Sequence, residues 1–199
     1  MVSFPIFERD NKTFHLNIEN VLFVLLVFFG ILGSSLQHTR FAYVINYAIG
    51  IIIICGFILL FANIFRIKPL YGKLNDSIIF DSSYIQIKDK VYSIEMIDKI
   101  FLRMNDYEGL EYIKIKPSFF PRLSNGTNNV VRLELKNGEK TITFFQSNLE
   151  YDYEKLRPLV VSLIRYNLLS IDGGRKILKL NTDYEVLKLQ NEVNKKELK

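Results

Sequence analysis

The sequence predicts a membrane α-helical hairpin followed by an α+β domain, and three observations lead to this fold class. Two long apolar runs without a charged side chain lie before Arg66. Short alternating segments, typical of antiparallel strands, follow from Leu70 onward. A segment with helical spacing of apolar residues begins near Ser147, after the last predicted strand. The mean hydropathy of +0.12 therefore averages two unlike parts of a 199-residue chain.

The two apolar runs have the length of membrane spans. The first, extended by its flanks to residues 18–37, reaches the roughly 17 to 20 residues that cross a hydrocarbon core. The second, residues 41–65, is long enough for a tilted span. The link between them is so short that we expect an antiparallel helical hairpin. A buried hairpin of a soluble protein would need a partner layer that the rest of the chain is too short to supply.

Basic residues at the ends of the two runs predict how the hairpin inserts. Arg9 and Lys12 precede the first run, and Arg40 lies in the link. Three more basic residues follow the second run: Arg66, Lys68 and Lys73. Because basic residues concentrate on the cytoplasmic side of a membrane, we expect both termini in the cytoplasm and the protein in a bacterial inner membrane.

Small and polar residues within the runs are candidates for packing between membrane helices. Glycines let two helix backbones approach closely, and asparagines form hydrogen bonds within lipid. The candidates are Gly30, Gly33, Asn46, Gly50, Gly56 and Asn63. Neither run carries a stripe of ionisable side chains, so we do not expect a channel or transporter.

The region after the hairpin has the pattern of an antiparallel sheet. Alternation predicts short strands at 76–80, 84–88, 91–93, 99–104, 111–116, 129–135 and 140–145. Asn137-Gly138 lies between the last two strands and is a strong local signal for a β-hairpin. Six or seven strands at regular spacing indicate a sandwich or a small barrel.

A helix is expected to follow the last strand. Ser147 and Glu150 have the spacing of a capping box. Apolar residues continue at helical spacing to Leu168 and predict a face that packs on the core. Pro158 lies within this pattern and predicts either a kink or a helix that starts near Arg157.

The chain after this helix is predicted to be a separate basic tail. Gly173-Gly174 should end the preceding helix, and basic residues outnumber acidic ones from Arg175 onward. We expect a short amphipathic helix here that docks on a partner or lies at the membrane surface. The predicted parts are a cytoplasmic segment (1–17), a two-span hairpin (18–66, spans 18–37 and 41–65), an α+β domain (70–169) and an amphipathic tail (170–199).

The order of these elements resembles that of a known protein family. Tyr84-Ile-Gln-Ile runs into Tyr92-Ser-Ile-Glu-Met-Ile-Asp-Lys-Ile100, and Asn137-Gly138-Glu139 marks the penultimate hairpin. With the two spans, this layout resembles bacterial membrane-anchored pleckstrin-homology-like (PH-like) proteins over residues 70–169. The resemblance implies a bent antiparallel barrel of about seven strands that a C-terminal helix closes at one end. It implies binding rather than catalysis, and the acidic loop Asp81-Ser-Ser83 argues against phosphoinositide binding.

The loop 114–122 is the candidate binding surface. It combines three cations, two adjacent aromatic rings and two prolines. The residues that we expect to bind a partner or the membrane are Lys114, Lys116, Phe119, Phe120 and Arg122. The rings would insert at the bilayer interface while the cations meet anionic lipid, or the same side chains would dock a protein. In a third interpretation the two phenylalanines fill the mouth of the barrel.

These features predict an inner-membrane binding or scaffold protein whose partners are the lipid bilayer and a protein or a second copy of the chain. The alternative is a two-span effector of antiphage defence whose β-barrel is gated by a cyclic nucleotide. The sequence has no Ser-His-Asp arrangement, zinc motif, nucleotide-binding loop or kinase signature, so we expect neither an enzyme nor a cofactor or metal. The net charge of +5 comes from mixed charges without an arginine-rich helix, which disfavours a nucleic-acid partner.

Overall fold

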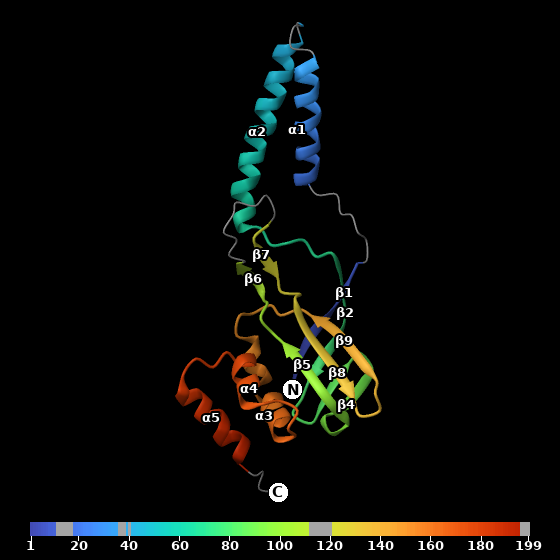
Figure 1. The fold of residues 1–199 in the computed structure, drawn as a ribbon, viewed down its shortest axis with the longest axis vertical. Helices are drawn as coiled ribbons and strands as arrows, with labels where there is room; N and C mark the ends of the chain where they lie inside the picture. The colour runs from blue at the N-terminus through green and yellow to red at the C-terminus, as the bar shows by residue number, and fades with distance from the viewer. Residues whose placement is uncertain (11–17, 36–38, 40, 112–120, 196–199) are drawn as a thin grey trace. The chain divides into compact units, whose positions relative to one another are not determined.

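A computed structural model describes residues 1–10, 18–35, 39, 41–111 and 121–195. The chain forms two compact units, and both are discontinuous in sequence (Figure 1). The first unit comprises residues 1–10, 70–110 and 124–199, and the second comprises residues 11–69 and 111–123. The helical hairpin is therefore inserted into the first unit rather than attached in front of it.

The first unit is an α+β domain built on a seven-stranded antiparallel sheet. In hydrogen-bonded order its strands are β4 (Lys90–Ser93), β3 (Tyr84–Ile87), β2 (Gly72–Phe80), β1 (Val2–Arg9), β9 (Lys140–Phe145), β8 (Asn129–Leu135) and β5 (Ile97–Arg103). The sheet is not closed, which corrects the prediction of a barrel. A 3-10 turn, Ile94–Met96, connects β4 to β5. This turn buries Ile94 in the core, so the backbone leaves the sheet between the two edge strands.

The first residues of the chain form a central strand of this sheet, which corrects the prediction of a separate N-terminal segment. β1 pairs with β2 from Val2↔Phe80 to Arg9↔Gly72, and with β9 through Ile6↔Phe145. A bulge between Pro5 and Ile6 shifts the register. The proline and the bulge break the alternation of apolar residues, which explains why no strand was predicted here.

One apolar core joins the sheet to the helices that follow it. Phe4 of β1, Phe80 of β2 and Phe145 of β9 are buried, and neighbouring ring centroids lie 5.4–6.0 Å apart. Fully buried leucines from the helical region, among them Leu156 and Leu163, belong to the same cluster. Removal of β1 would therefore take away both ladder hydrogen bonds and core side chains.

Three helices follow β9: α3 (Arg157–Arg165), α4 (Ile171–Ile177) and α5 (Asp183–Asn194). α3 begins at Arg157 with Pro158 in its first turn, one of the two predicted outcomes. A 3-10 turn (Asp152–Leu156) precedes it. The predicted capping box at Ser147 is wrong, because its hydroxyl donates to Asp152 Oδ2 at 2.9 Å within a turn.

A capping box does exist, at the start of α5. The amide of Glu185 donates to Thr182 Oγ1 at 3.3 Å, and the amide of Thr182 donates to Glu185 Oε2 at 3.0 Å. Glu185 Oε2 accepts hydrogen bonds from the amide and the hydroxyl of Thr182 and from the amide of Asn181, and these bonds lower the pKa of the Glu185 carboxyl below its ordinary value. The Thr-x-x-Glu spacing was present in the sequence and marks where the last helix begins.

Residues 170–194 belong to the folded domain, which corrects the prediction of a separate tail. Leu189 of α5 is fully buried, and Ile177 and Leu180 also lie in the core. The predicted helix-ending glycines lie inside α4, where the amide of Gly173 donates to Ser170 Oγ at 3.0 Å. The apolar spacing that suggested a surface helix is thus the core-facing side of α4 and α5.

Gly174 allows α4 to approach its neighbours closely. A Cβ at this position would lie 2.9 Å from Ile164 Cδ1, 3.1 Å from Val160 Cγ1 and 3.3 Å from Leu189 Cδ2. These atoms belong to buried side chains of α3 and α5, so they have little freedom to move.

We expect Gly174→Ala to lower the free energy of unfolding by about 1–3 kcal/mol through overpacking. Denaturant unfolding of the detergent-solubilised chain, followed by circular dichroism, measures the change. Gly173→Ala is the control. Its Cβ would lie 2.6 Å from Leu169 Cδ1, but Leu169 is only half-buried and the end of its side chain can turn away, and both changes alter helix propensity equally. Equal stabilities of the two variants would contradict the packing assigned to α4.

The second unit contains the hairpin helices α1 (Ile18–Ser35) and α2 (Ala42–Phe65), which run antiparallel (Figure 1). Among the described helices, α2 is the one whose length and composition suffice to cross a membrane. α1 is apolar over the shorter stretch Asn20–Ser35, whereas the sequence predicted two spans. A two-stranded ribbon, β6 (Glu108–Glu111) and β7 (Leu123–Asn125), flanks residues 112–120. The predicted strand 111–116 lies mostly outside the described residues.

Candidate membrane-facing site

One face of α2 packs toward α1 in a repeat of three and four residues. The buried or half-buried residues of this stripe are Ile45, Ile49, Ile52, Gly56, Leu59 and Asn63. In α1 the half-buried positions Leu22, Phe29 and Gly33 are separated by seven and four residues. Such spacing places each set on one side of its helix, as in antiparallel helical pairs.

The remaining surface of the hairpin is apolar and exposed. Only 6% of the most apolar window of α2 is buried within the protein. Phe23 is 68% exposed, and Tyr47 and Phe65 are 75% and 79% exposed. A core helix of a water-soluble protein has most of its apolar side chains buried, whereas these helices present them outward.

The predicted packing residues occupy different environments in the hairpin. A Cβ on Gly33 would lie 3.3 Å from Ile45 Cγ2, so this glycine marks close contact between the helices. A Cβ on Gly30, Gly50 or Gly56 would meet nothing within 4 Å. Asn46 is exposed on the outer face of α2. The structure therefore places Gly33 at the contact between α1 and α2.

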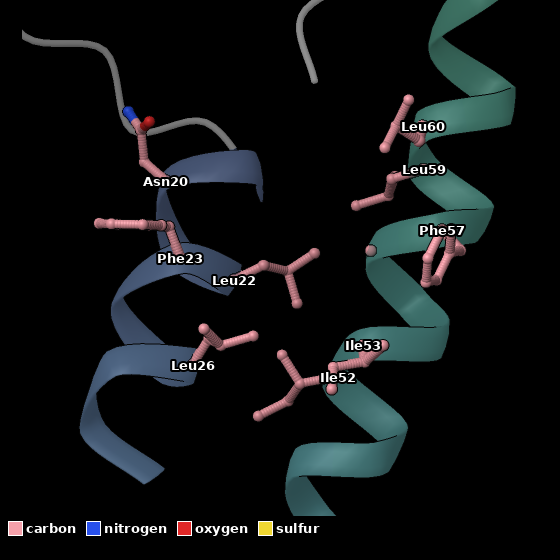
Figure 2. A pocket seen from close by; sticks show the side chains of 10 residues that line it. Asn20, Leu22, Phe23, Leu26, Ile52, Ile53, Phe57, Leu59 and Leu60 are labelled. Atoms are coloured by element: carbon pink, nitrogen blue, oxygen red, sulfur yellow. The ribbon is translucent and has the colours of Figure 1, made fainter. Parts of the chain in front are cut away.

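An apolar groove lies between the helices at the end where α1 begins and α2 ends. Figure 2 shows the side chains that line it, and its volume is about 430 Å³. α1 contributes Asn20, Leu22, Phe23 and Leu26, and α2 contributes six residues between Ile52 and Leu60. Gly56 belongs to this wall and adds no side chain. The hairpin is thus closely packed near Gly33 and open near Leu60.

The last turn of α2 ends in a set of polar and basic residues. Asn63 is fully buried, and its Oδ1 accepts a hydrogen bond from Arg66 Nη1 at 3.0 Å. The amide of Arg122 donates to the Asn63 carbonyl at 3.0 Å, and the amide of Lys68 donates to the Leu123 carbonyl at 2.8 Å. Ile67 and Leu123 form a parallel bridge. Arg66, Lys68 and Arg122 are therefore held around one helix end, here named the basic end.

The candidate binding loop is only partly described. Lys114, Lys116, Phe119 and Phe120 lie outside the described residues, so the structure gives them no position. Arg122 is described, and its backbone is bonded to α2. The sequence predicts Arg122 as a binding residue and Asn63 as a packing residue, but it does not indicate that the two lie together. Asn63 and Arg66 do have the three-residue spacing of neighbours on a helix.

The hairpin leaves the sheet between two paired strands. The amide of Asp10 donates to the Tyr71 carbonyl at 3.0 Å, directly beyond the Arg9↔Gly72 pair. A Cβ on Gly72 would lie 2.3 Å from the Glu8 carbonyl oxygen, so glycine is required at this junction. Both ends of the insertion are consequently held side by side.

An exposed ion pair strengthens this junction. Lys88 of the β3–β4 turn donates to Glu8 Oε1 at 2.5 Å, and Asn75 donates to Glu8 Oε2 at 3.2 Å. These hydrogen bonds and the charge of Lys88 lower the pKa of Glu8 below its ordinary value. The pKa of Lys88 is raised by the same pairing. Because its pKa is lowered, Glu8 stabilises the folded state at pH values above the ordinary pKa of a glutamate. This contribution is lost as the pH falls through the pKa that Glu8 has in the folded state.

A buried polar cluster holds the base of the β6–β7 ribbon. Asn129 is fully buried and donates through Nδ2 to the carbonyls of Asp106 and Gly126, each at 2.9 Å. Its Oδ1 accepts from the amide of Asp106 at 3.0 Å, and Asp106 Oδ2 accepts from the amide of Asn128 at 2.8 Å. Since the buried groups are mutually satisfied, this cluster fixes backbone rather than forming a reactive site.

A second carboxylate, Asp152, fixes the turn before α3. It accepts hydrogen bonds from Ser147, from the amide of Leu149 and from Lys155, the last at 2.6 Å. Burial alone would raise the pKa of Asp152, but the bonds from Lys155, Leu149 and Ser147 outweigh it and leave the pKa below its ordinary value. The carboxylate therefore stays charged near neutral pH and serves as a structural acceptor.

The described residues contain no group of three or more His, Cys, Asp or Glu side chains arranged to hold a metal ion. Searches against protein-family models, curated proteins and solved structures find no match to the chain.

Proposed function

We propose that the protein is a membrane-anchored binding protein in which the helical hairpin crosses the bilayer twice and the part of the chain outside the bilayer binds a partner. The exposed apolar surface of α2 supports this proposal, because its 24 residues span about 36 Å at about 1.5 Å per residue. The hydrocarbon core needs about 30 Å. A lipid environment covers the apolar faces that the protein leaves exposed.

The β1–β2 pairing is the observation that carries the two-span proposal. β1 precedes the hairpin, β2 follows it, and they are neighbours over their whole length. A single crossing by α2 would put the two paired strands on opposite sides of the membrane. If α2 crosses, the segment before it must cross as well. α1 supplies 18 residues, about 27 Å, for that second crossing.

The orientation follows from the charges that flank the hairpin. Arg9 precedes α1, and Arg66, Lys68 and Lys73 follow α2, whereas Arg40 alone lies in the link. The positive-inside rule then places the α+β domain and both termini in the cytoplasm, at the inner membrane of a bacterium.

The topology of the domain supports a PH-like assignment. In the main sheet, strands that are consecutive along the chain are antiparallel neighbours, except that β4 and β5 do not pair with each other. The first strand, β1, pairs with the last, β9. A helix, α3, follows the last strand and packs its leucines into the core. We therefore propose an open PH-like sheet rather than a closed barrel. We assign this domain a role in binding and no role in catalysis.

The loop 114–122 is the proposed surface for a protein partner. Arg122 at its end donates through its backbone amide to the Asn63 carbonyl in the last turn of α2, so the loop ends at the basic end of the hairpin. We expect the tagged full-length protein to copurify with a fixed partner in mild detergent, as identified by mass spectrometry. The partner should be lost from a Phe119→Ser/Phe120→Ser variant.

The matched control for this experiment changes exposed apolar residues elsewhere. Leu149 and Tyr151 are 61% and 63% exposed on the α+β domain, and Leu149→Ser/Tyr151→Ser should retain the partner. Purification of the unaltered protein as a monomer without a partner would contradict the proposed function. Loss of the partner from both double variants would contradict the assignment of the binding surface to the loop.

A further inference from the structure

The hairpin groove and the basic end have complementary chemistry. The groove of about 430 Å³ is lined by apolar side chains, and Gly56 leaves its wall without a side chain at that position. At the link end, Gly33 brings the two helices into direct contact. The groove is therefore a local opening within an otherwise packed pair of helices, and it is suited to a flexible apolar chain.

The groove leads along α2 toward the basic end. Leu59 and Leu60 line the groove, and Asn63 follows them by one helical turn on the same stripe. Arg66 follows by three more residues, and hydrogen bonds hold Arg66 and the backbone of Arg122 against Asn63. With Lys68, three basic residues thus lie where the stripe ends.

A phospholipid combines the two chemistries in the same order. Its acyl chain is apolar, and its phosphate lies at the depth where basic side chains meet an anionic membrane surface. A helix from a second copy fits less well. Copies inserted in the same direction would bring their basic ends to the same depth, where like charges repel.

We propose that the groove between α1 and α2 holds an acyl chain of an anionic phospholipid of the bilayer, whose phosphate lies at the basic end formed by Arg66, Lys68 and Arg122. This inference rests on the proposed membrane anchoring. It assigns the end of the hairpin a lipid ligand, in addition to general contact with the bilayer.

The test compares two glycine variants of the full chain. Protein is reconstituted in vesicles of phosphatidylcholine mixed equally with phosphatidylglycerol, then released in mild detergent and analysed by native mass spectrometry. The unaltered protein should retain phosphatidylglycerol. Gly56→Phe should lose it, because the ring fills the groove, whereas Gly50→Phe should retain it, because Gly50 also has open space but does not line the groove.

A second pair of variants tests the charges. We expect Arg66→Gln and Arg122→Gln each to reduce the preference for phosphatidylglycerol over phosphatidylcholine about fivefold. Lys188→Gln, an exposed change on α5, should leave the preference unaltered. Equal retention by the Gly56 and Gly50 variants, or an unchanged preference in both arginine variants, would overturn the proposal.

The anchoring proposal has a separate readout in the same experiment. Flotation of the vesicles shows whether the protein is inserted before any lipid is counted. Protein that does not float with the vesicles would refute membrane anchoring. Protein that floats but retains no phosphatidylglycerol, or that forms a dimer lost in Gly56→Phe, would refute only the lipid site.

Discussion

A chain that lacks residues 2–9 is expected to lose its folded sheet altogether. β1 lies in the middle of the strand order, so its removal separates β4-β3-β2 from β9-β8-β5. The same deletion removes Phe4 and Ile6 from the core. Each large buried side chain contributes about 2–5 kcal/mol, and two of them approach the total stability of a typical domain. Loss of the β-sheet circular dichroism signal and rapid proteolysis of the α+β domain would measure this outcome.

The converse variant keeps β1 and removes the hairpin. Replacement of residues 11–70 by Asn-Gly would join Asp10 to Tyr71, which already face each other through a 3.0 Å backbone hydrogen bond. Asn-Gly is the preferred sequence for such a two-residue turn. We expect this chain to be water-soluble and folded. If the chain without residues 2–9 folds with unaltered stability, the central position of β1 is wrong.

Asn129→Ala is expected to have the largest effect of any single substitution in the polar cluster. It removes donors to the Asp106 and Gly126 carbonyls and the acceptor for the Asp106 amide, all in a buried environment. Because buried groups left unsatisfied cost about 1–3 kcal/mol each, we expect the free energy of unfolding to fall by about 3–5 kcal/mol. Denaturant unfolding of the full chain in detergent, monitored by circular dichroism, provides the measurement.

Asn137→Ala is the matched control for this substitution. Asn137 lies in the exposed turn between β8 and β9, where its Oδ1 accepts from the amide of Glu139 at 2.9 Å. Water replaces this bond when the side chain is removed, so the loss should stay below about 1 kcal/mol. Similar losses for the two alanine variants would show that the buried cluster does not hold the domain together.

Local patterns predicted the elements that local chemistry determines. The β8–β9 hairpin follows from Asn137-Gly138, and Gly138 has the positive φ of 85° that this turn requires. The start of α3 follows from Pro158, whose ring fits the first turn of a helix. Both features depend on residues that are close in sequence, so the amino-acid sequence alone is sufficient to predict them.

The features that were missed depend on contacts between distant segments. β1 contains a proline and a bulge, and its partner β2 begins after the whole hairpin. Gly173-Gly174 resembles a helix end, but Gly174 is required by contact with Val160 and Leu189. Asn129 is correctly predicted to begin a strand, but nothing local indicates that its side chain is buried. The same limit applies to the basic end, where Asn63 and Arg122 come from separate parts of the sequence.

The central claim is that the hairpin crosses the membrane twice while β1 and β2 stay paired on one side. Single cysteines at Thr39, in the link, and at Ser83, between β2 and β3, report the two sides once Cys55 is changed to Ser. Intact cells are treated with a membrane-impermeant maleimide. The proposed topology predicts labelling of Thr39→Cys from outside, and labelling of Ser83→Cys only after the cells are permeabilised. Labelling of both positions from the same side would contradict it.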